Sequence, residues 1–199
     1  KDSAEKGKKT GKHESAFHIE KEGAGRVIIL GVPNVGKSQL LTALTNAQPT
    51  VTAAPFSTWT PLPGMMEWQN VQIQLIDTPP LNHEHMESEQ FDLIRSADLL
   101  ILMISLQADA PAQLQDSRQI LEQHHINLSC RPDEPPGDKK NITNSILLVI
   151  NKCDDDRFDE DLELLQELIE CDWPMVAVSA STLRNIDTLK KAVFEQLNI

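Results

Sequence analysis

The sequence predicts an α/β fold in which a mostly parallel, doubly wound sheet of six strands carries helices on both faces. Three observations support this prediction. Apolar runs of strand length alternate with segments of helical periodicity. A glycine-rich loop separates the first apolar run from the first helical segment. The run at 99–104 is continuously apolar, which is typical of a parallel strand buried on both faces.

The expected strands follow the apolar runs in order. After the first strand at 26–30, the runs at 65–68 and 71–76 are separated by two residues, which predicts a hairpin. In the second of these runs, apolar residues alternate with Gln72 and Gln74, so we expect one solvated face. Three further runs complete the predicted sheet at 99–104, 145–150 and 175–178.

The expected helices lie at 37–45, 87–95, 110–124, 159–170 and 186–197. The first has an apolar face of Leu40, Leu41 and Leu44. Asp109 followed by Pro111 predicts the start of the third, as a cap and a first-turn proline. The last has an inward stripe of Ile186, Leu189, Val193 and Leu197.

Composition indicates a soluble globular protein. The 199 residues are 40% hydrophobic and 24% charged, which suits one domain with a large core. The net charge of −12 argues against a whole surface that binds nucleic acid or acidic membranes. No apolar run approaches the roughly 20 residues of a membrane span, so we expect no membrane insertion. Three widely spaced cysteines give no disulfide framework or zinc pattern and favour a reducing, cytoplasmic location.

Two segments are expected to lack a packed structure. Residues 1–24 are polar and lysine-rich at their start, so we expect a flexible linker from a missing upstream region, since the chain does not begin with Met. A basic arm that touches RNA is the alternative. Residues 125–144 contain three prolines and a glycine, which predicts a disordered insertion within a domain at 25–199.

Four short motifs, in this order, predict a guanine-nucleotide site. GVPNVGKS (31–38) matches the glycine-rich loop whose N–H groups wrap phosphates while Lys37 reaches the β/γ oxygens. PFST (55–58) and DTPP (77–80) follow. NKCD (151–154) ends in Asp154, whose two carboxylate oxygens accept from adjacent guanine N–H donors that adenine lacks. In a doubly wound sheet, these motifs meet beyond the carboxyl ends of the strands.

Each motif supplies residues with an expected role. Ser38, Thr58 and Asp77 are the expected Mg²⁺ ligands, with Asp77 acting through water, and Lys37, Thr58 and Asp77 are the candidate catalytic groups. A solvated carboxylate at a strand end is the alternative interpretation of Asp77. We expect Asn151 to brace the phosphate loop, Lys152 to lie along the base, and 179–180 to offer backbone N–H groups to the guanine oxygen. The predicted nucleotide-binding set is Gly31, Pro33, Asn34, Val35, Gly36, Lys37, Ser38, Gln39, Phe56, Thr58, Asp77, Asn151, Lys152, Asp154, Ser179 and Ala180.

The motifs resemble a known family. GVPNVGKSQLLTALTNA (31–47), PFSTWTPLPG (55–64), VQIQLIDTPPL (71–81) and NKCD are similar to the G domain of translation-factor-class (TRAFAC) P-loop GTPases, nearest the Obg and developmentally regulated GTP-binding protein group. The resemblance implies GTP or GDP with Mg²⁺ and a cytoplasmic GTPase that acts at the ribosome or in its assembly. It implies contact with the ribosome or rRNA through regions outside this chain, and a K⁺ ion held with the help of Asn34.

Two departures from the family pattern bear on catalysis. Pro80 stands where the family has a glycine whose N–H contacts the γ-phosphate, and proline has no N–H. Leu81 stands where Ras-like enzymes have a water-orienting glutamine. His83 and His85, with nearby glutamates, are candidates to position water or to bind a metal, but a solvated loop is favoured.

Three functions are compatible with the sequence. We favour a slow GTPase switch. The second is a guanine-nucleotide-binding module with little or no hydrolysis, which serves as an interaction scaffold. The third, an ATP-using phosphoryl-transfer enzyme, is disfavoured because NKCD has no purpose there. The sequence makes no prediction of oligomeric state.

Overall fold

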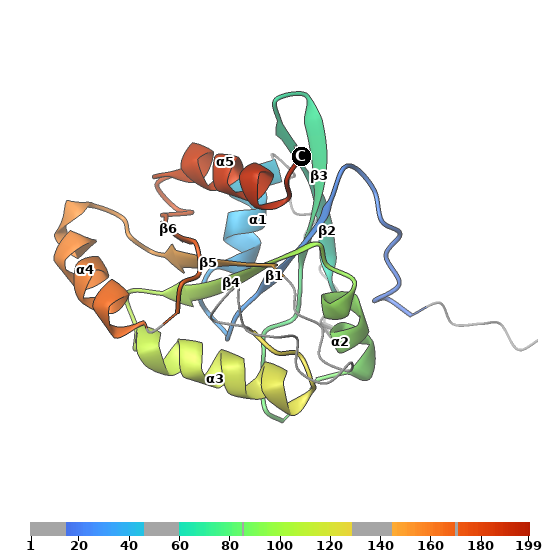
Figure 1. Ribbon diagram of the computed structural model, residues 1–199, viewed down its shortest axis with the longest axis horizontal. Coiled ribbons are helices and arrows are strands. Elements are labelled where there is room, and N and C mark those ends of the chain that lie inside the picture. The colour runs from blue at the N-terminus through green and yellow to red at the C-terminus, as the bar shows by residue number, and fades with distance from the viewer. Residues whose placement is uncertain (1–14, 46–59, 85, 129–144, 170) are drawn as a thin grey trace, which may run out of the picture.

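The computed structural model describes residues 15–45, 60–84, 86–128, 145–169 and 171–199, and six strands form one sheet in the order β2-β3-β1-β4-β5-β6 (Figure 1). Only β2 runs antiparallel to its neighbour, because the hairpin joins it to β3. The predicted fold class is therefore confirmed. The strands are β1 (Arg26–Leu30), β2 (Leu62–Trp68), β3 (Val71–Asp77), β4 (Leu99–Ser105), β5 (Ser145–Asn151) and β6 (Met175–Ala177).

The helices cover both faces of this sheet (Figure 1). Within the described ranges they are α1 (Lys37–Thr45), α2 (Ser88–Arg95), α3 (Ala110–Gln123), α4 (Asp159–Leu168) and α5 (Ile186–Gln196), with a 3-10 turn, η1 (Asp156–Phe158). Their bounds differ from the predicted ones by two residues or fewer. The Asp109 side chain accepts from the Ala112 N–H at 3.0 Å, which confirms the predicted cap of α3.

Two hydrophobic cores lie on opposite faces of the sheet. Successive side chains of a strand point to opposite faces, so Val27 and Ile29 of β1 pack with α1 and α5. Ile28 and Leu30 join the core beneath α2, α3 and α4. All four side chains are fully buried. This two-sided burial explains why the central strands are continuously apolar.

One expectation about β3 was wrong. Gln72 is exposed as predicted, but Gln74 is buried. The Gln74 side chain accepts from Arg26 Nε at 2.9 Å, and its Nε2 donates to the Glu20 carbonyl at 2.8 Å. A buried amide is tolerated here because both of its ends have partners.

Residues 15–24 pack against the domain rather than leaving it. Phe17 is buried in the core beneath α2 and α3. The Ile19 carbonyl accepts from the Arg26 guanidinium at 2.6 Å, and the Ala24 N–H donates to Gln72 at 2.8 Å. The packed region therefore begins before the boundary predicted at residue 25.

The start of the segment 125–144, which was predicted to be a disordered insertion, is packed. Ile126 and Leu128 are buried in the core beneath α3, because the chain turns back onto the sheet after that helix. The remainder of this segment, 129–144, lies outside the described residues.

Cys171 is disulfide-bonded, against the expectation from cysteine spacing, whereas Cys153 is a free, buried thiol.

Candidate nucleotide site

The described parts of the predicted motifs meet at one edge of the sheet. The glycine-rich loop follows β1, DTPP begins at the end of β3, and NKCD begins at the end of β5. These three strands are parallel and lie close together in the sheet. β1 pairs with β3 on one side and with β4 on the other, and β5 follows β4. Phe56 and Thr58 lie outside the described residues.

Asn151 ties the phosphate loop to the segment that follows β6. Its Nδ2 donates to the Val35 carbonyl at 2.8 Å, and its Oδ1 accepts from the Ala180 N–H at 3.0 Å. Gly36 has φ +96°, and a Cβ there would lie 2.4 Å from Asn151 Nδ2. Glycine at this position therefore allows both the backbone conformation and the close approach of Asn151. Of the other loop residues, Pro33, Asn34 and Gln39 are exposed and Val35 is buried.

Lys37, Ser38 and Asp77 converge where phosphates and a metal are expected. Lys37 Nζ donates to the Gly31 carbonyl at 3.2 Å, and Ser38 Oγ donates to Asp77 Oδ2 at 2.5 Å. Burial raises the pKa of Asp77, while the Ser38 hydrogen bond and the Lys37 charge act in the opposite direction. Burial likewise lowers the pKa of Lys37, against the attraction of Asp77.

The chemistry of this cluster fits Mg²⁺. Asp77 Oδ1 is buried and has no hydrogen-bond partner among the described residues, so one carboxylate oxygen is left for a ligand. Mg²⁺ binds oxygen ligands and keeps several waters, which suits one hydroxyl, Ser38, and one carboxylate. Across the described ranges, no three His, Cys, Asp or Glu side chains gather as a metal site. The alternative in which His83 and His85 bind a metal stays a prediction, because His85 lies outside those ranges.

Asp154 is surrounded by side-chain donors. Its Oδ1 accepts from Ser179 Oγ at 2.6 Å and from Ser181 Oγ at 3.0 Å, and its Oδ2 accepts from Gln107 Nε2 at 3.0 Å. These hydrogen bonds, with that of Ser179 the largest influence, lower the pKa of Asp154. The carboxylate is therefore held ionised, as the recognition of two N–H donors requires.

The segment after β6 differs from the sequence-based expectation. We expected its backbone N–H groups to face the guanine oxygen. Instead, the Ser179 N–H donates to the Arg184 carbonyl at 3.1 Å, and the Ala180 N–H donates to Asn151. In this conformation the Ser179 hydroxyl, rather than either N–H, donates to Asp154.

Two residues that donate to Asp154 were not predicted from the sequence. Ser181 follows 179–180 directly, so the hydroxyl-rich run Ser-Ala-Ser-Thr was an available signal for donors near Asp154. Gln107 had no local signal. It reaches Asp154 and the Lys152 carbonyl because β4 and β5 pair in a register that places Ser105 opposite Asn151.

Hydrogen bonds hold the loop after β3 against the glycine-rich loop and α2. The Leu81 N–H donates to the Gly31 carbonyl at 3.0 Å, and Gln90 Nε2 of α2 donates to the Pro79 carbonyl at 2.8 Å. The Leu81 side chain is 1% exposed, so it faces the core rather than a nucleotide. Pro80 is half-buried and has no N–H to donate.

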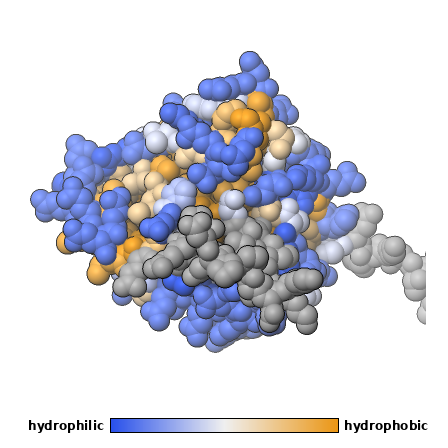
Figure 2. All heavy atoms as spheres, in the orientation of Figure 1, coloured by the Kyte–Doolittle hydropathy of each residue, from blue (hydrophilic) through white to orange (hydrophobic). Residues whose placement is uncertain are grey.

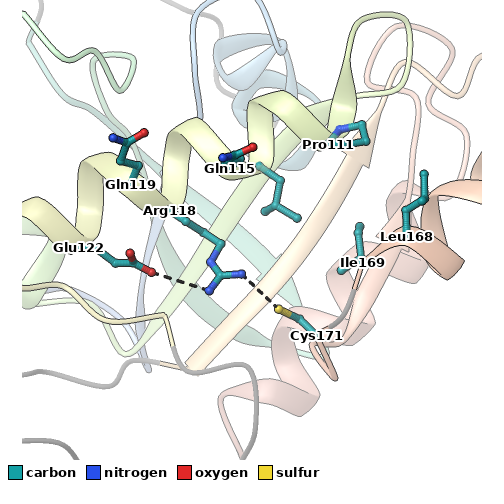
Figure 3. A pocket seen from close by; sticks show the side chains of 9 residues that line it. Pro111, Gln115, Arg118, Gln119, Glu122, Leu168, Ile169 and Cys171 are labelled. Atoms are coloured by element: carbon teal, nitrogen blue, oxygen red, sulfur yellow. Dashed lines mark hydrogen bonds and ion pairs between the residues drawn. The ribbon is translucent and has the colours of Figure 1, made fainter.

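A groove of about 520 Å³ lies apart from these motifs, between α3 and the end of α4 (Figure 3). Arg118 of α3 extends into it and contacts Cys171 Sγ at 3.8 Å and Glu122 at 3.7 Å. Figure 2 shows a mostly hydrophilic face on which apolar residues gather beside α4, where Leu164 and Leu168 are exposed. None of the predicted site residues lines this groove.

The chain is similar to known GTP-binding proteins. Residues 26–152 match the family described as 50S ribosome-binding GTPase. Over 129 residues, 62% of the chain, it is 33% identical to an uncharacterised GTP-binding protein of Methanocaldococcus jannaschii, of which it covers 32%. Over 102 residues, 49% of the chain, it is 34% identical to a developmentally-regulated GTP-binding protein 2 homolog of Dictyostelium discoideum, of which it covers 28%. The chain thus spans about a third of the length of these curated relatives.

A solved structure shares the fold. Era, in complex with MgGDPNP and nucleotides 1506–1542 of 16S ribosomal RNA, matches 86% of this chain and 56% of its own with a TM-score of 0.61 and 21% identity. At this identity the likeness shows the fold alone. Within the described residues, no helix is both long and apolar enough to cross a membrane.

Proposed function

Because the chain belongs to the 50S ribosome-binding GTPase family, we propose that it is a Mg²⁺-dependent guanine-nucleotide switch that hydrolyses GTP slowly. We place its action in the cytoplasm, at the ribosome or in ribosome assembly. The observation that carries this proposal is the meeting of Ser38 and Asp77 beside Lys37, with one buried Asp77 oxygen that has no partner among the residues that the structure describes. A switch needs such a site, because it must sense the metal and the γ-phosphate together.

In this proposal one group of residues binds the phosphates and the metal, and another binds the base. Lys37 would turn from the Gly31 carbonyl to the β/γ oxygens, and Ser38 would exchange Asp77 for the metal. Bound Mg²⁺ supplies charge neutralisation at the phosphate oxygens. Asp77 would then hold metal-bound water through its second oxygen, and Thr58 is the proposed further ligand. Asp154 would select guanine, while Asn151 holds the phosphate loop in place.

The ribosomal part of the proposal is supported by relatives and by charge. The matching family is named for ribosome binding, and Era was crystallised with a ribosomal RNA segment. The net charge of −12 disfavours broad RNA contact by this chain. We therefore assign the RNA contact to regions outside it.

Asn34, exposed on the phosphate loop with φ 66°, is the proposed contributor to a K⁺ site.

A second candidate function is a guanine-nucleotide-binding module with little or no hydrolysis. The specific observation that favours it is the loop after β3. Pro80 has no N–H for the γ-phosphate, and Leu81 is buried with its N–H already bonded to Gly31. Such a module would bind GTP and GDP and act as a scaffold.

A single-turnover assay with GTP, with and without ribosomes, separates the two candidates. The switch predicts slow hydrolysis alone and faster hydrolysis with ribosomes. Bound GTP that stays intact under both conditions would contradict the switch and favour the scaffold. His83→Ala serves as a further test of water positioning, and we expect it to leave the rate unchanged because His83 is exposed.

A further inference from the structure

The Asp154 carboxylate has more donors than a guanine site can keep. Each carboxylate oxygen has about two lone-pair sites. Oδ1 accepts from both Ser179 and Ser181, so it is full, whereas Oδ2 accepts only from Gln107 among the described residues. One acceptor place on Oδ2 is therefore left.

A guanine edge brings two donors, N1–H and one N–H of its amino group, which bind one to each oxygen. Together with the three protein donors they make five, against about four acceptor sites. One donor on Oδ1 must therefore leave when guanine binds in this way. Gln107 stays, because Oδ2 has room for the amide and for one guanine N–H.

Burial decides which of the two serines leaves. Ser179 is fully buried, and its Oγ also accepts from the Thr182 N–H at 3.1 Å. Moving it would leave the buried Ser179 hydroxyl without its partners. Ser181 is exposed, so its hydroxyl can turn to water. The Ser179 and Ser181 oxygens are 2.9 Å apart, which gives the released hydroxyl an acceptor nearby as well.

We infer that Ser181 is a built-in competitor for the base: its hydroxyl occupies the place on Asp154 Oδ1 that one guanine N–H takes. The inference rests on the proposed guanine-nucleotide binding and adds a residue that sets its affinity and selectivity. A base with a single donor, such as hypoxanthine, uses the open place on Oδ2 and leaves Ser181 where it is. Ser181 therefore weakens guanine binding more than hypoxanthine binding.

The test is calorimetric titration of the chain and its variants with GDP and with inosine diphosphate. Ser181→Ala is expected to bind GDP about two- to tenfold more tightly, since one exposed hydroxyl–carboxylate bond no longer has to be broken. Its affinity for inosine diphosphate is expected to change less than about twofold. Ser181→Thr keeps a hydroxyl and is expected to resemble the wild type. Thr182→Ala removes an exposed hydroxyl from the same turn and serves as the matched control.

The possible outcomes separate this inference from the function on which it rests. Wild-type chain that fails to bind GDP would overturn both. If the wild type binds GDP, an unchanged or weaker GDP affinity in Ser181→Ala overturns the inference alone. An equal gain for both nucleotides also overturns it, because a general change in the turn would act on both. Thermal unfolding of each variant verifies that it is folded before titration.

Discussion

Replacing Pro80 by glycine is expected to speed GTP hydrolysis, because it returns one backbone N–H to the loop after β3. The neighbouring N–H cannot substitute in the observed conformation, since Leu81 already donates to the Gly31 carbonyl at 3.0 Å. Removing one backbone donor from a developing negative charge costs about 10²–10³ in rate. We therefore expect Pro80→Gly to raise the single-turnover rate by at least about tenfold and by at most about 10³.

The contacts that hold the loop after β3 in place also explain why we expect the protein alone to hydrolyse GTP slowly. Swinging the loop outward breaks the Gln90–Pro79 and Leu81–Gly31 hydrogen bonds, each worth about 0.5–1.5 kcal/mol. It also exposes Leu81, whose burial is worth about 1.5–3 kcal/mol. Together these contributions favour the fastened loop by about 2.5–6 kcal/mol. Glycine should also loosen the loop, so the ratio of GTP to GDP affinity is expected to widen.

The assay is formation of GDP from GTP with the protein in excess. Pro79→Gly is the matched control, because it loosens the same loop while residue 80 stays proline. Lys37→Ala should abolish binding and sets the background. Brisk turnover by the unassisted wild type, with no change in Pro80→Gly, would refute the reasoning. An equal gain in Pro79→Gly would assign the effect to flexibility rather than to the restored donor.

Three further predictions concern the base, the cation and the free thiol. Asp154→Asn replaces a carboxylate acceptor by an amide and should shift the binding preference toward xanthine nucleotides, with more than about a tenfold loss of affinity for GDP. Competition binding that still favours GDP would argue against the assigned role of Asp154. Hydrolysis should be faster in K⁺ than in Na⁺, and identical rates, or an unaltered salt response in Asn34→Asp, would count against a K⁺ site. Burial raises the pKa of Cys153 to about 11, so about one thiol in a thousand is ionised at pH 8. Peptide mass spectrometry should therefore find it slowly alkylated by iodoacetamide when folded and rapidly in urea, and rapid modification of the folded chain would contradict its burial.

The sheet was predictable because its signals are local. A continuous apolar run of strand length such as 99–104 is typical of a strand covered on both faces, and β4 is buried throughout. Gln74 was misjudged because alternation reports only which face a residue lies on. What covers that face is decided by Arg26 and Glu20, which are distant in sequence. Phe17 likewise anchors a segment whose average composition is polar.

In the candidate site, too, residues within motifs were predictable, whereas residues placed by tertiary structure were not. Ser38 and Asp77 were expected together because each ends or begins an element at a fixed place in its motif, and the structure brings their side chains to 2.5 Å. Gln107 reaches Asp154 only through the pairing of β4 with β5, which no motif encodes. The N–H groups at 179–180 donate within the chain because a strand end can turn its backbone inward, as the hydrogen bond from the Ser179 N–H to the Arg184 carbonyl does. Their role toward guanine stays a prediction.

Calorimetric titration with GDP and with ADP, each with Mg²⁺, tests the central claim of guanine selection by Asp154 most directly. Adenine lacks the N–H donors that Asp154 would accept, and a hydrogen bond to a charged group is worth about 1.5–3 kcal/mol, so we predict that GDP binds at least about tenfold more tightly than ADP. Lys37→Ala should remove both signals. Equal affinity for GDP and ADP, or binding of neither by the folded chain, would contradict the account.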